Sequence, residues 1–379
     1  MFGPILLLVA AGLVGPLLAS TRRPLVPVLV GELFAGAALG RTGLGWLHPD
    51  VQPMPAFMTL GLAMLMLQAG TEVDIRSPVL RQRAGRGVLA LAITAAVSVP
   101  IGLAVSALTG AGHATLIVVL LAGSSAAVAF PTITEQGLTG PAVAMLLAWI
   151  TLADASTALV MPLTLTGVGT IPKALGGDVM IVAVAGAALL VARRLFQTGA
   201  ADAAKKMSKA RHWALQLRVA LLLLLALATI SQYTGASLLV AGFAAGIVMR
   251  QFHEPHRLVH QLTGLATGFF VPAFFVLLGA TLDLRGLLAA PSAIVLAVAM
   301  AGGAAIAHVV AGLAAARDER LASGLLSSAQ LGLPAAAASL GLAEHVLTPP
   351  IAAALVAGGI LTLVPATAGA VLLARGSAR

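Results

Sequence analysis

The sequence has no cysteine and very little charge. Of its 379 residues, 9% are charged and 59% are hydrophobic, whereas about 25% of a typical soluble domain is charged. The absence of cysteine excludes disulfides, thiolate metal sites and cysteine redox chemistry. The scarcity of charge excludes a disordered chain, a coiled coil and an ordinary cytosolic enzyme, because a soluble fold of this size could not cover its surface with so few charges. We therefore expect a membrane protein.

Thirteen apolar runs are separated by charged or Pro/Gly-rich breaks, and their lengths suit membrane-spanning helices. They lie at about 3–19, 25–40, 56–72, 87–108, 114–130, 142–166, 178–193, 214–232, 236–249, 263–282, 291–316, 321–342 and 350–374. The predicted fold class is an all-α polytopic membrane protein with about 13 transmembrane helices. Because only short loops remain, residues 1–379 are predicted to form a single transmembrane unit without a soluble regulatory domain.

Basic residues are distributed unevenly over the connecting segments. With the N-terminus outside, all but three of the 22 Lys and Arg residues fall on inside segments; the three are Arg41, Lys173 and Arg285. This is the distribution of the positive-inside rule. We therefore predict a multi-pass protein of a bacterial-type inner (plasma) membrane, with its N-terminus outside and its C-terminus cytoplasmic. The net charge of +9 then reflects orientation and contact with membrane lipids, and no nucleic-acid partner is predicted.

Three patterns of the first half recur in the second half at a nearly constant offset. Leu29-Val30 with Ala35-Gly36 recurs at 239–246, and Gly70-x-x-x-Asp74 recurs at 279–283. Ser124-Ser125-Ala126, with Pro131 five residues later, recurs as Ser327-Ser328-Ala329 with Pro334. The offset covers seven runs, an odd number, so the two copies face opposite ways. Inverted repeats are typical of secondary transporters, which bind their substrate near the midplane where the repeats meet.

The third pattern predicts two broken helices, at 114–130 and 321–342. Proline removes a backbone donor and favours a break, and a break at membrane depth is tolerated where protein or a water-filled cavity satisfies it. Crossed breaks would offer hydroxyls, free carbonyls and helix-end dipoles to an ion. The polar residues at the two breaks are Ser124, Ser125, Ser327, Ser328 and Gln330. A proline kink packed by small residues is the structural alternative.

Asp154 lies near the centre of the run at 142–166. A carboxylate at that depth costs about 2.5–3.5 kcal/mol on insertion scales, so it indicates a functional site. Thr151 and Thr157 lie three residues to either side, on the same helix face. A carboxylate among hydroxyls can hold a proton or help to coordinate a dehydrated monovalent cation. A buried, protonated and hydrogen-bonded structural Asp is the alternative.

Two further titratable residues lie in apolar runs. His308 can change its charge in the physiological range, either as a partner of Asp154 or as a neutral helix-packing residue. Glu32 follows Gly31 in a Gly/Ala-rich run that suggests close packing, and we expect it to be a structural acid. No nucleotide loop, GxSxG, zinc-protease or EF-hand pattern occurs, so neither a metal site nor a cofactor is predicted.

Several stretches resemble the monovalent cation:proton antiporters, especially the Kef-like and bacterial sodium/proton exchanger branch. Residues 27–40 are similar to that family's P-x-x-x-G-E-x-x-A-G-x-x-x-G stretch, 68–74 to its AGxExD segment and 272–279 to its PxFFxxxG segment. The resemblance covers nearly the whole chain. It implies two inverted six-helix repeats joined by a linker helix at 178–193. It also implies a homodimer, with scaffold helices at 1–86 and 214–290 and an ion-translocating core at 87–166 and 291–374.

The same resemblance assigns roles within the core. It implies that Asp154 is the exchanging carboxylate and that Ser124 and Ser125 supply supporting hydroxyls. The chain departs from the family pattern at three places. Ala153 replaces the usual acid, Asn or Gln, His308 stands where many members carry Lys, and Gly332-Leu333 replaces a Gly-Glu pair. This smaller ligand set leaves the identity of the cation and the stoichiometry open.

We therefore predict a secondary active transporter, not an enzyme, that serves pH homeostasis. It would exchange Na⁺ or K⁺ for H⁺ by alternating access through a mid-membrane carboxylate. Three alternatives remain. A sodium-coupled organic-anion symporter on a related fold would need a deep Arg, an intramembrane hydrolase would pair Ser124 or Ser125 with His308, and a sensor or channel-like homologue would not exchange ions.

Overall fold

The computed structural model of the chain is all-helical in the part that it describes. The described residues are 2–20, 28–72, 78–135, 138, 141–165, 171–199, 204, 206–208, 211, 213–234, 236–251, 255–314 and 319–377. Ten helical stretches there are long and apolar enough to cross a membrane by length and composition, and two shorter apolar helices accompany them. This confirms the predicted all-α polytopic fold class.

The helices group into two compact units, which are described separately. The first unit consists of residues 1–51, 75–165 and 275–379, and the second of 52–74 and 166–274. The described helices of the first unit are α1 (Phe2–Gly12), α2 (Val14–Ala19), α3 (Val28–Leu39), α5 (Pro78–Thr109), α6 (Ala114–Ala122), α7 (Ala126–Glu135), α8 (Pro141–Leu165), the later part of α14 (Val271–Thr281), α15 (Leu284–Ala289), α16 (Pro291–Ala311), η3 (Gly312–Ala314), α17 (Arg320–Ser327), α18 (Gly332–Ala343), α19 (Pro349–Leu361) and α20 (Leu363–Ser377). Those of the second unit are α4 (Met54–Glu72), α9 (Ile171–Gln197), α11 (Leu215–Thr234), α12 (Leu238–Arg250), α13 (Pro255–Leu265), the π-helical η2 (Ala266–Phe270) and the first residues of α14.

Each of the thirteen predicted runs has a helical counterpart, and the α6–α7 pair occupies the run at 114–130. The bounds differ most at α5 and α9, which begin at Pro78 and Ile171 and are longer than predicted. A hydropathy pattern marks the apolar part of a helix and misses its polar ends. The count of thirteen membrane crossings stays a prediction. So does the division into a scaffold and a core, because it concerns motion.

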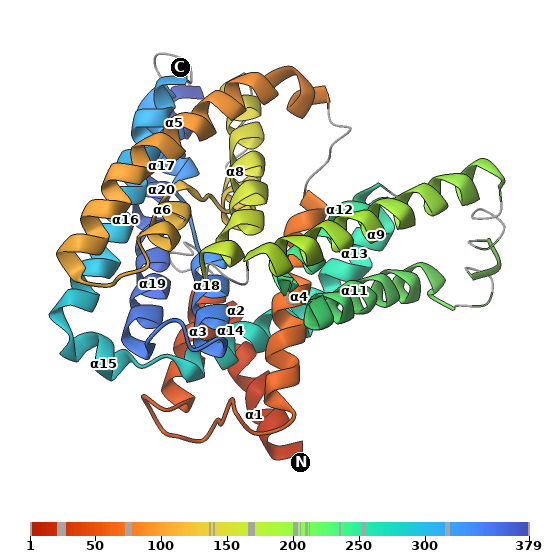
Figure 1. Ribbon diagram of the computed structural model, residues 1–379, viewed down its shortest axis with the longest axis horizontal. Coiled ribbons are helices and arrows are strands. Elements are labelled where there is room, and N and C mark those ends of the chain that lie inside the picture. The colour runs from red at the N-terminus through yellow and green to blue at the C-terminus, as the bar shows by residue number, and fades with distance from the viewer. Residues whose placement is uncertain are drawn as a thin grey trace. The chain divides into compact units, whose positions relative to one another are not determined.

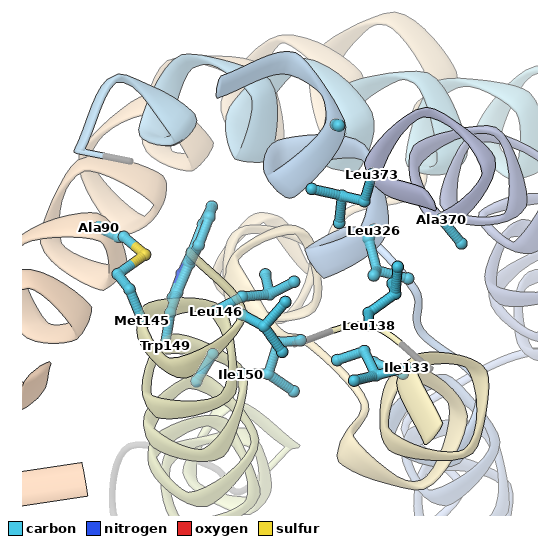
Figure 2. Packing of buried hydrophobic residues seen from close by; sticks show 14 of the residues in the cluster. Ala90, Ile133, Leu138, Met145, Leu146, Trp149, Ile150, Leu326, Ala370 and Leu373 are labelled. Atoms are coloured by element: carbon cyan, nitrogen blue, oxygen red, sulfur yellow. The ribbon is translucent and has the colours of Figure 1, made fainter. Parts of the chain in front are cut away.

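Helices from both parts of the chain pack around α16 in the first unit. Helices α5, α6, α17 and α19 all contact α16 (Figure 1). A buried apolar cluster joins α8 to α7, α17 and α20 (Figure 2). It includes Trp149 and Ile150 from α8, Ile133 from α7, Leu326 from α17 and Leu373 from α20. This cluster fixes one face of α8 and thereby positions the residues that α8 presents at the crossing described below.

Two of the repeated patterns form equivalent close contacts between helices. In the first unit, Gly36 of α3 lies against the Val276 carbonyl of α14, and Gly279 of α14 lies against the Leu33 carbonyl of α3. In the second unit, Gly246 of α12 lies against the backbone of Gly70 in α4. A Cβ at any of these positions would overlap the facing backbone. The second helix of each repeat therefore packs against the third helix of the other repeat.

Candidate functional site

Two interrupted helices meet in the first unit. Helix α6 ends at Ala122 and the chain turns extended at Gly123 (φ −71°, ψ 159°) before α7 begins. Helix α17 ends at Ser327, and Leu331 (φ −144°, ψ −50°) precedes α18. The backbone N–H of Ser125 donates to the Ala329 carbonyl at 2.8 Å. Both predicted broken helices are thus interrupted, and their breaks are in contact.

The two prolines of the repeated motif do not lie at the breaks, as predicted, but within the half-helices that follow. The sequence predicts breaks at Pro131 and Pro334, but Pro131 lies within α7 and Pro334 is the third residue of α18. The amide groups of a helix's first turn have no partner within the helix, so a proline there costs no hydrogen bond. Pro334 therefore suits the start of the second half-helix. The extended backbone at Gly123 interrupts the first broken helix.

Side chains tie the two breaks together. The Ser124 hydroxyl donates to the Ser327 carbonyl, and the Gln330 Nε2 amide donates to the Gly123 carbonyl at 2.7 Å. Ser124, Ser327 and Gln330 are all buried. An unwound segment at membrane depth needs partners inside the protein for its backbone groups. The two breaks supply partners to each other.

Helix α8 brings Asp154 to this crossing. Its Oδ2 accepts a hydrogen bond from the backbone N–H of Ala126 at 3.1 Å. Ala126 is the first residue of α7, so the carboxylate lies at the positive end of that half-helix, where a negative charge is stabilised. Asp154 is half-buried and its neighbour Ala153 is fully buried.

Of the two predicted threonines, Thr157 lies at the first break, whereas Thr151 is only known to be buried in α8. Thr157 Oγ1 donates to the Ala153 carbonyl at 2.6 Å, so its proton is used within α8 and its lone pairs stay available. The same oxygen lies at the first break, because a Cβ on Gly123 would stand 3.5 Å from it. Thr151 is buried about one turn before Asp154 on α8. Thr157 is thus placed to offer an oxygen beside Asp154, although it donates no hydrogen bond to the carboxylate.

The serines of the second break are used differently from those of the first. Ser327 Oγ donates to the Gly324 carbonyl at 3.0 Å, and Ser328 Oγ donates to the Leu325 carbonyl at 2.7 Å. Helix α17 continues as far as Ser327, so both hydroxyls find a carbonyl three residues back. Ser124 and Ser125 follow the end of α6. The second copy therefore contributes its backbone carbonyls to the crossing.

Among the described contacts, none joins His308 or Glu32 to the Asp154 carboxylate. His308 stacks on Trp149, with ring centroids 5.5 Å apart, and no described contact joins it to Asp154. Trp149 and Asp154 are five positions apart on α8, which turns them about 140° from each other around the helix axis. No described hydrogen bond joins Ser124 or Ser125 to His308, so the described residues do not form the nucleophile–base pair that the hydrolase alternative needs. Glu32 is buried in α3, with its Cγ close to Gly15 of α2.

The sequence analysis missed Thr362, which links the second break to the junction of α19 and α20. Its buried Oγ1 accepts from the Gln330 backbone N–H at 2.9 Å and donates to the Gly359 carbonyl at 2.6 Å. The sequence signal that could have identified Thr362 is a hydroxyl residue between two apolar helices. Thr362 does not belong to any of the repeated patterns, so the repeat did not point to it. Among the residues that the structure describes, no group of three or more His, Asp or Glu side chains could hold a metal ion.

Replacing Gln330 by Ala should destabilise the crossing. The change removes the donor that satisfies the Gly123 carbonyl and leaves that buried oxygen unpaired, at a cost of about 1–3 kcal/mol. We expect a lower midpoint of thermal unfolding in detergent. Gln216→Ala, at a half-buried position of α11, is the matched control and should leave the midpoint unchanged. Equal midpoints for the two variants would show that the bond between the breaks contributes nothing to stability.

Comparisons with a family model and with known proteins all find sodium/proton exchangers. A family model described as "Sodium/hydrogen exchanger, transmembrane" matches residues 6–374. A putative Na⁺/H⁺ antiporter of Bacillus subtilis is 25% identical over 365 residues, which cover 90% of this chain and 58% of that protein. A Na⁺/H⁺ antiporter of Synechocystis is 26% identical over 273 residues, which cover 69% of this chain and 37% of that protein. The chain therefore spans less than two thirds of these two relatives.

A solved structure shares the fold. The sodium proton antiporter of Methanocaldococcus jannaschii at pH 8 superposes with a TM-score of 0.61 and 18% sequence identity. The match covers 99% of this chain and 95% of that chain. At this identity the likeness speaks for the fold alone.

Proposed function

Because the chain belongs to the sodium/hydrogen exchanger family, we propose that it exchanges a monovalent cation, Na⁺ or K⁺, for protons across a membrane. One observation carries the proposal. Asp154 lies at the contact of two interrupted helices and is bonded to the first amide of a half-helix. A carboxylate so placed can bind either a proton or a cation.

In this mechanism Asp154 binds its two substrates in turn. When the carboxyl is protonated it has no charge to attract a cation, and when a cation is bound the proton must have left. The cation would be held by the Asp154 carboxylate, the lone pairs of Thr157 and carbonyls of the unwound segments. Ser124, Ser125, Thr151, Ser327, Ser328 and Gln330 would support these ligands. One exchanging carboxylate favours one cation for one proton, which moves no net charge.

The remaining features of the proposal concern assembly and motion. Residues 87–166 and 291–374 would move as the ion-translocating core, relative to scaffold helices at 1–86 and 214–290, with 178–193 as the linker. The protein would be a homodimer in a bacterial-type plasma membrane, with its N-terminus outside and its C-terminus cytoplasmic. The distribution of Lys and Arg supports this orientation. Alternating access would follow from exposure of the Asp154 site to each side in turn.

The test is cation-driven proton movement in liposomes. The purified chain is reconstituted with a pH-sensitive dye inside, an acid-inside pH gradient is imposed, and Na⁺, K⁺ and Li⁺ are added in turn. We expect at least one cation to dissipate the gradient, whether or not the membrane potential is clamped. Dissipation by none of them would contradict exchange, and ion currents above transporter turnover would favour a channel-like protein.

A further inference from the structure

Thr362 occupies a fixed position between two helices of the first unit. It follows the last residue of α19 and precedes the first residue of α20. Its backbone N–H donates to the Gly358 carbonyl at 3.1 Å, and its carbonyl accepts from the Ala366 N–H at 3.2 Å. The backbone of Thr362 is therefore bonded to both helices, which fixes where its buried side chain stands.

The hydroxyl of Thr362 attaches the second break to this junction. A hydroxyl has one hydrogen and two lone pairs. Thr362 Oγ1 accepts from the Gln330 backbone N–H at 2.9 Å and donates to the Gly359 carbonyl at 2.6 Å, and the Gln330 carbonyl lies 3.1 Å away. Gln330 lies between α17 and α18, where its N–H has no helical partner. A buried backbone N–H needs a partner, and Thr362 supplies it.

Two further bonds connect the segment around Gln330 to the first break. The Gln330 Nε2 amide donates to the Gly123 carbonyl at 2.7 Å, and the Ala329 carbonyl accepts from the Ser125 N–H at 2.8 Å. Both positions on the first break lie within three residues of Ala126, whose N–H binds the carboxylate presented by α8. The α19–α20 junction is thus connected, through both breaks, to the amide that holds this carboxylate.

The backbone of α19 approaches the second break closely at the same place. A Cβ on Gly359 would stand 3.2 Å from the Gln330 carbonyl and 3.1 Å from the ring of Pro334. The break therefore rests against α19, and the Thr362 hydroxyl holds it there. Without that hydroxyl the buried N–H of Gln330 would lose its partner, so the segment would have to shift or bind water. Either response would change the distances at the crossing.

We propose that Thr362 is a positioning residue for the cation that binds at Asp154. Thr362 does not touch the cation and acts through Gln330. Its hydroxyl keeps the second break in register with the first, so that the carbonyls of the unwound segments and the Thr157 oxygen keep their distances to the carboxylate. Groups that hold the ligands of a metal ion affect its binding although they do not touch it. The inference rests on the proposed function.

The first experiment measures cation-driven exchange in liposomes for Thr362→Val, Thr362→Ser and Thr367→Val. Val keeps the shape of Thr without its hydroxyl, and Ser keeps the hydroxyl. Thr367 is the matched control, because its Oγ1 donates to the Leu363 carbonyl at 2.7 Å at an exposed position of the same helix. We expect Thr362→Val to raise the half-saturating cation concentration about tenfold, with a much smaller change in the maximal rate.

The relative preference for Na⁺, K⁺ and Li⁺ should also change in Thr362→Val, because ions of different size respond differently to displaced ligands. Thr362→Ser and Thr367→Val should behave as the wild type. A hydroxyl that only stabilises the fold would lower the maximal rate for all cations alike and leave their half-saturating concentrations unchanged. That result, or a Thr362→Ser protein that behaves as Thr362→Val does, would overturn the inference and leave the proposed function intact.

The second experiment measures cation binding without transport. A bound cation raises the midpoint of thermal unfolding in detergent, and the midpoint without cation reports the structural cost of each substitution. Thr362→Val, or Thr362→Ala if the Val variant does not fold, should need about tenfold more cation than the wild type for the same rise. An equal requirement would overturn the inference, as would loss of folding in both variants while Thr362→Ser folds normally. Absence of exchange in the wild type would contradict the proposed function and the inference with it.

Discussion

Asp154→Asn is expected to lower cation:proton exchange by at least about 100-fold. The amide keeps the size of the side chain and an oxygen that can accept from the Ala126 N–H. It carries no negative charge and binds no proton, so it can neither attract a cation nor return a proton. The folded structure should therefore survive while both substrates lose their binding group. Exchange is measured in liposomes with a pH-sensitive dye, and folding by size-exclusion chromatography and thermal unfolding.

Asp178 offers a matched control for this change. It is also half-buried in a helix, α9, and its Oδ1 accepts from a backbone N–H, that of Ser237, at 3.3 Å. It belongs to the second unit, whereas the crossing lies in the first. Asp178→Asn should keep exchange within a few-fold of the wild type. If Asp154→Asn retained exchange with unchanged proton coupling, the assignment of the exchanging carboxylate would be wrong.

Gly36→Leu should have the largest effect on folding. A Cβ at Gly36 would already overlap the Val276 carbonyl, and Leu adds three more carbon atoms at the same place. Overpacking usually costs about 1–3 kcal/mol. Here the obstacle is backbone, which cannot move aside as a side chain can, so we expect a cost at or above the upper end of that range. The measurement is the yield of monodisperse protein in detergent and the midpoint of its thermal unfolding.

The matched control is the same substitution where space is open. No atom lies within 4 Å of a Cβ on Gly302 in α16, so Gly302→Leu should fold normally. Gly246→Leu, at the equivalent position of the other repeat, should be as damaging as Gly36→Leu because its Cβ would overlap the Leu67 carbonyl. A stable Gly36→Leu protein would show that the close contact between α3 and α14 is not required.

Much of the fold is readable in the sequence because hydropathy and repetition are strong signals. The apolar runs located the helices, and the repeated Ser-Ser-Ala motif located both interruptions independently of hydropathy. The bonds that hold the crossing were not readable. Ala126 and Ala329 act through backbone atoms, which no side-chain pattern encodes, and Ser327 contributes its carbonyl in place of the hydroxyl that the motif suggested.

Which side chains meet at the site depends on how each helix is rotated about its own axis, and the sequence does not give that rotation. The depth of His308 in its run could be predicted, but its contact with Trp149 rather than with Asp154 follows from which faces of α16 and α8 meet. Thr362 escaped notice because it lies outside the repeat and contacts Gln330 across 32 positions of chain. Long-range pairing of this kind appears only once the helices are packed.

The exchanged packing of the two repeats has a consequence for biosynthesis. Gly36 needs the backbone at Val276, and Gly70 needs that at Gly246, so helices of the first half find their partners only after most of the chain has been made. At typical translation rates the 240 positions between Gly36 and Val276 take on the order of 10–50 s to synthesise. During that interval the glycine-lined faces of α3 and α4 lie in the bilayer without their final neighbours. The two halves are therefore not independent folding units, and neither should reach its native packing when it is expressed without the other.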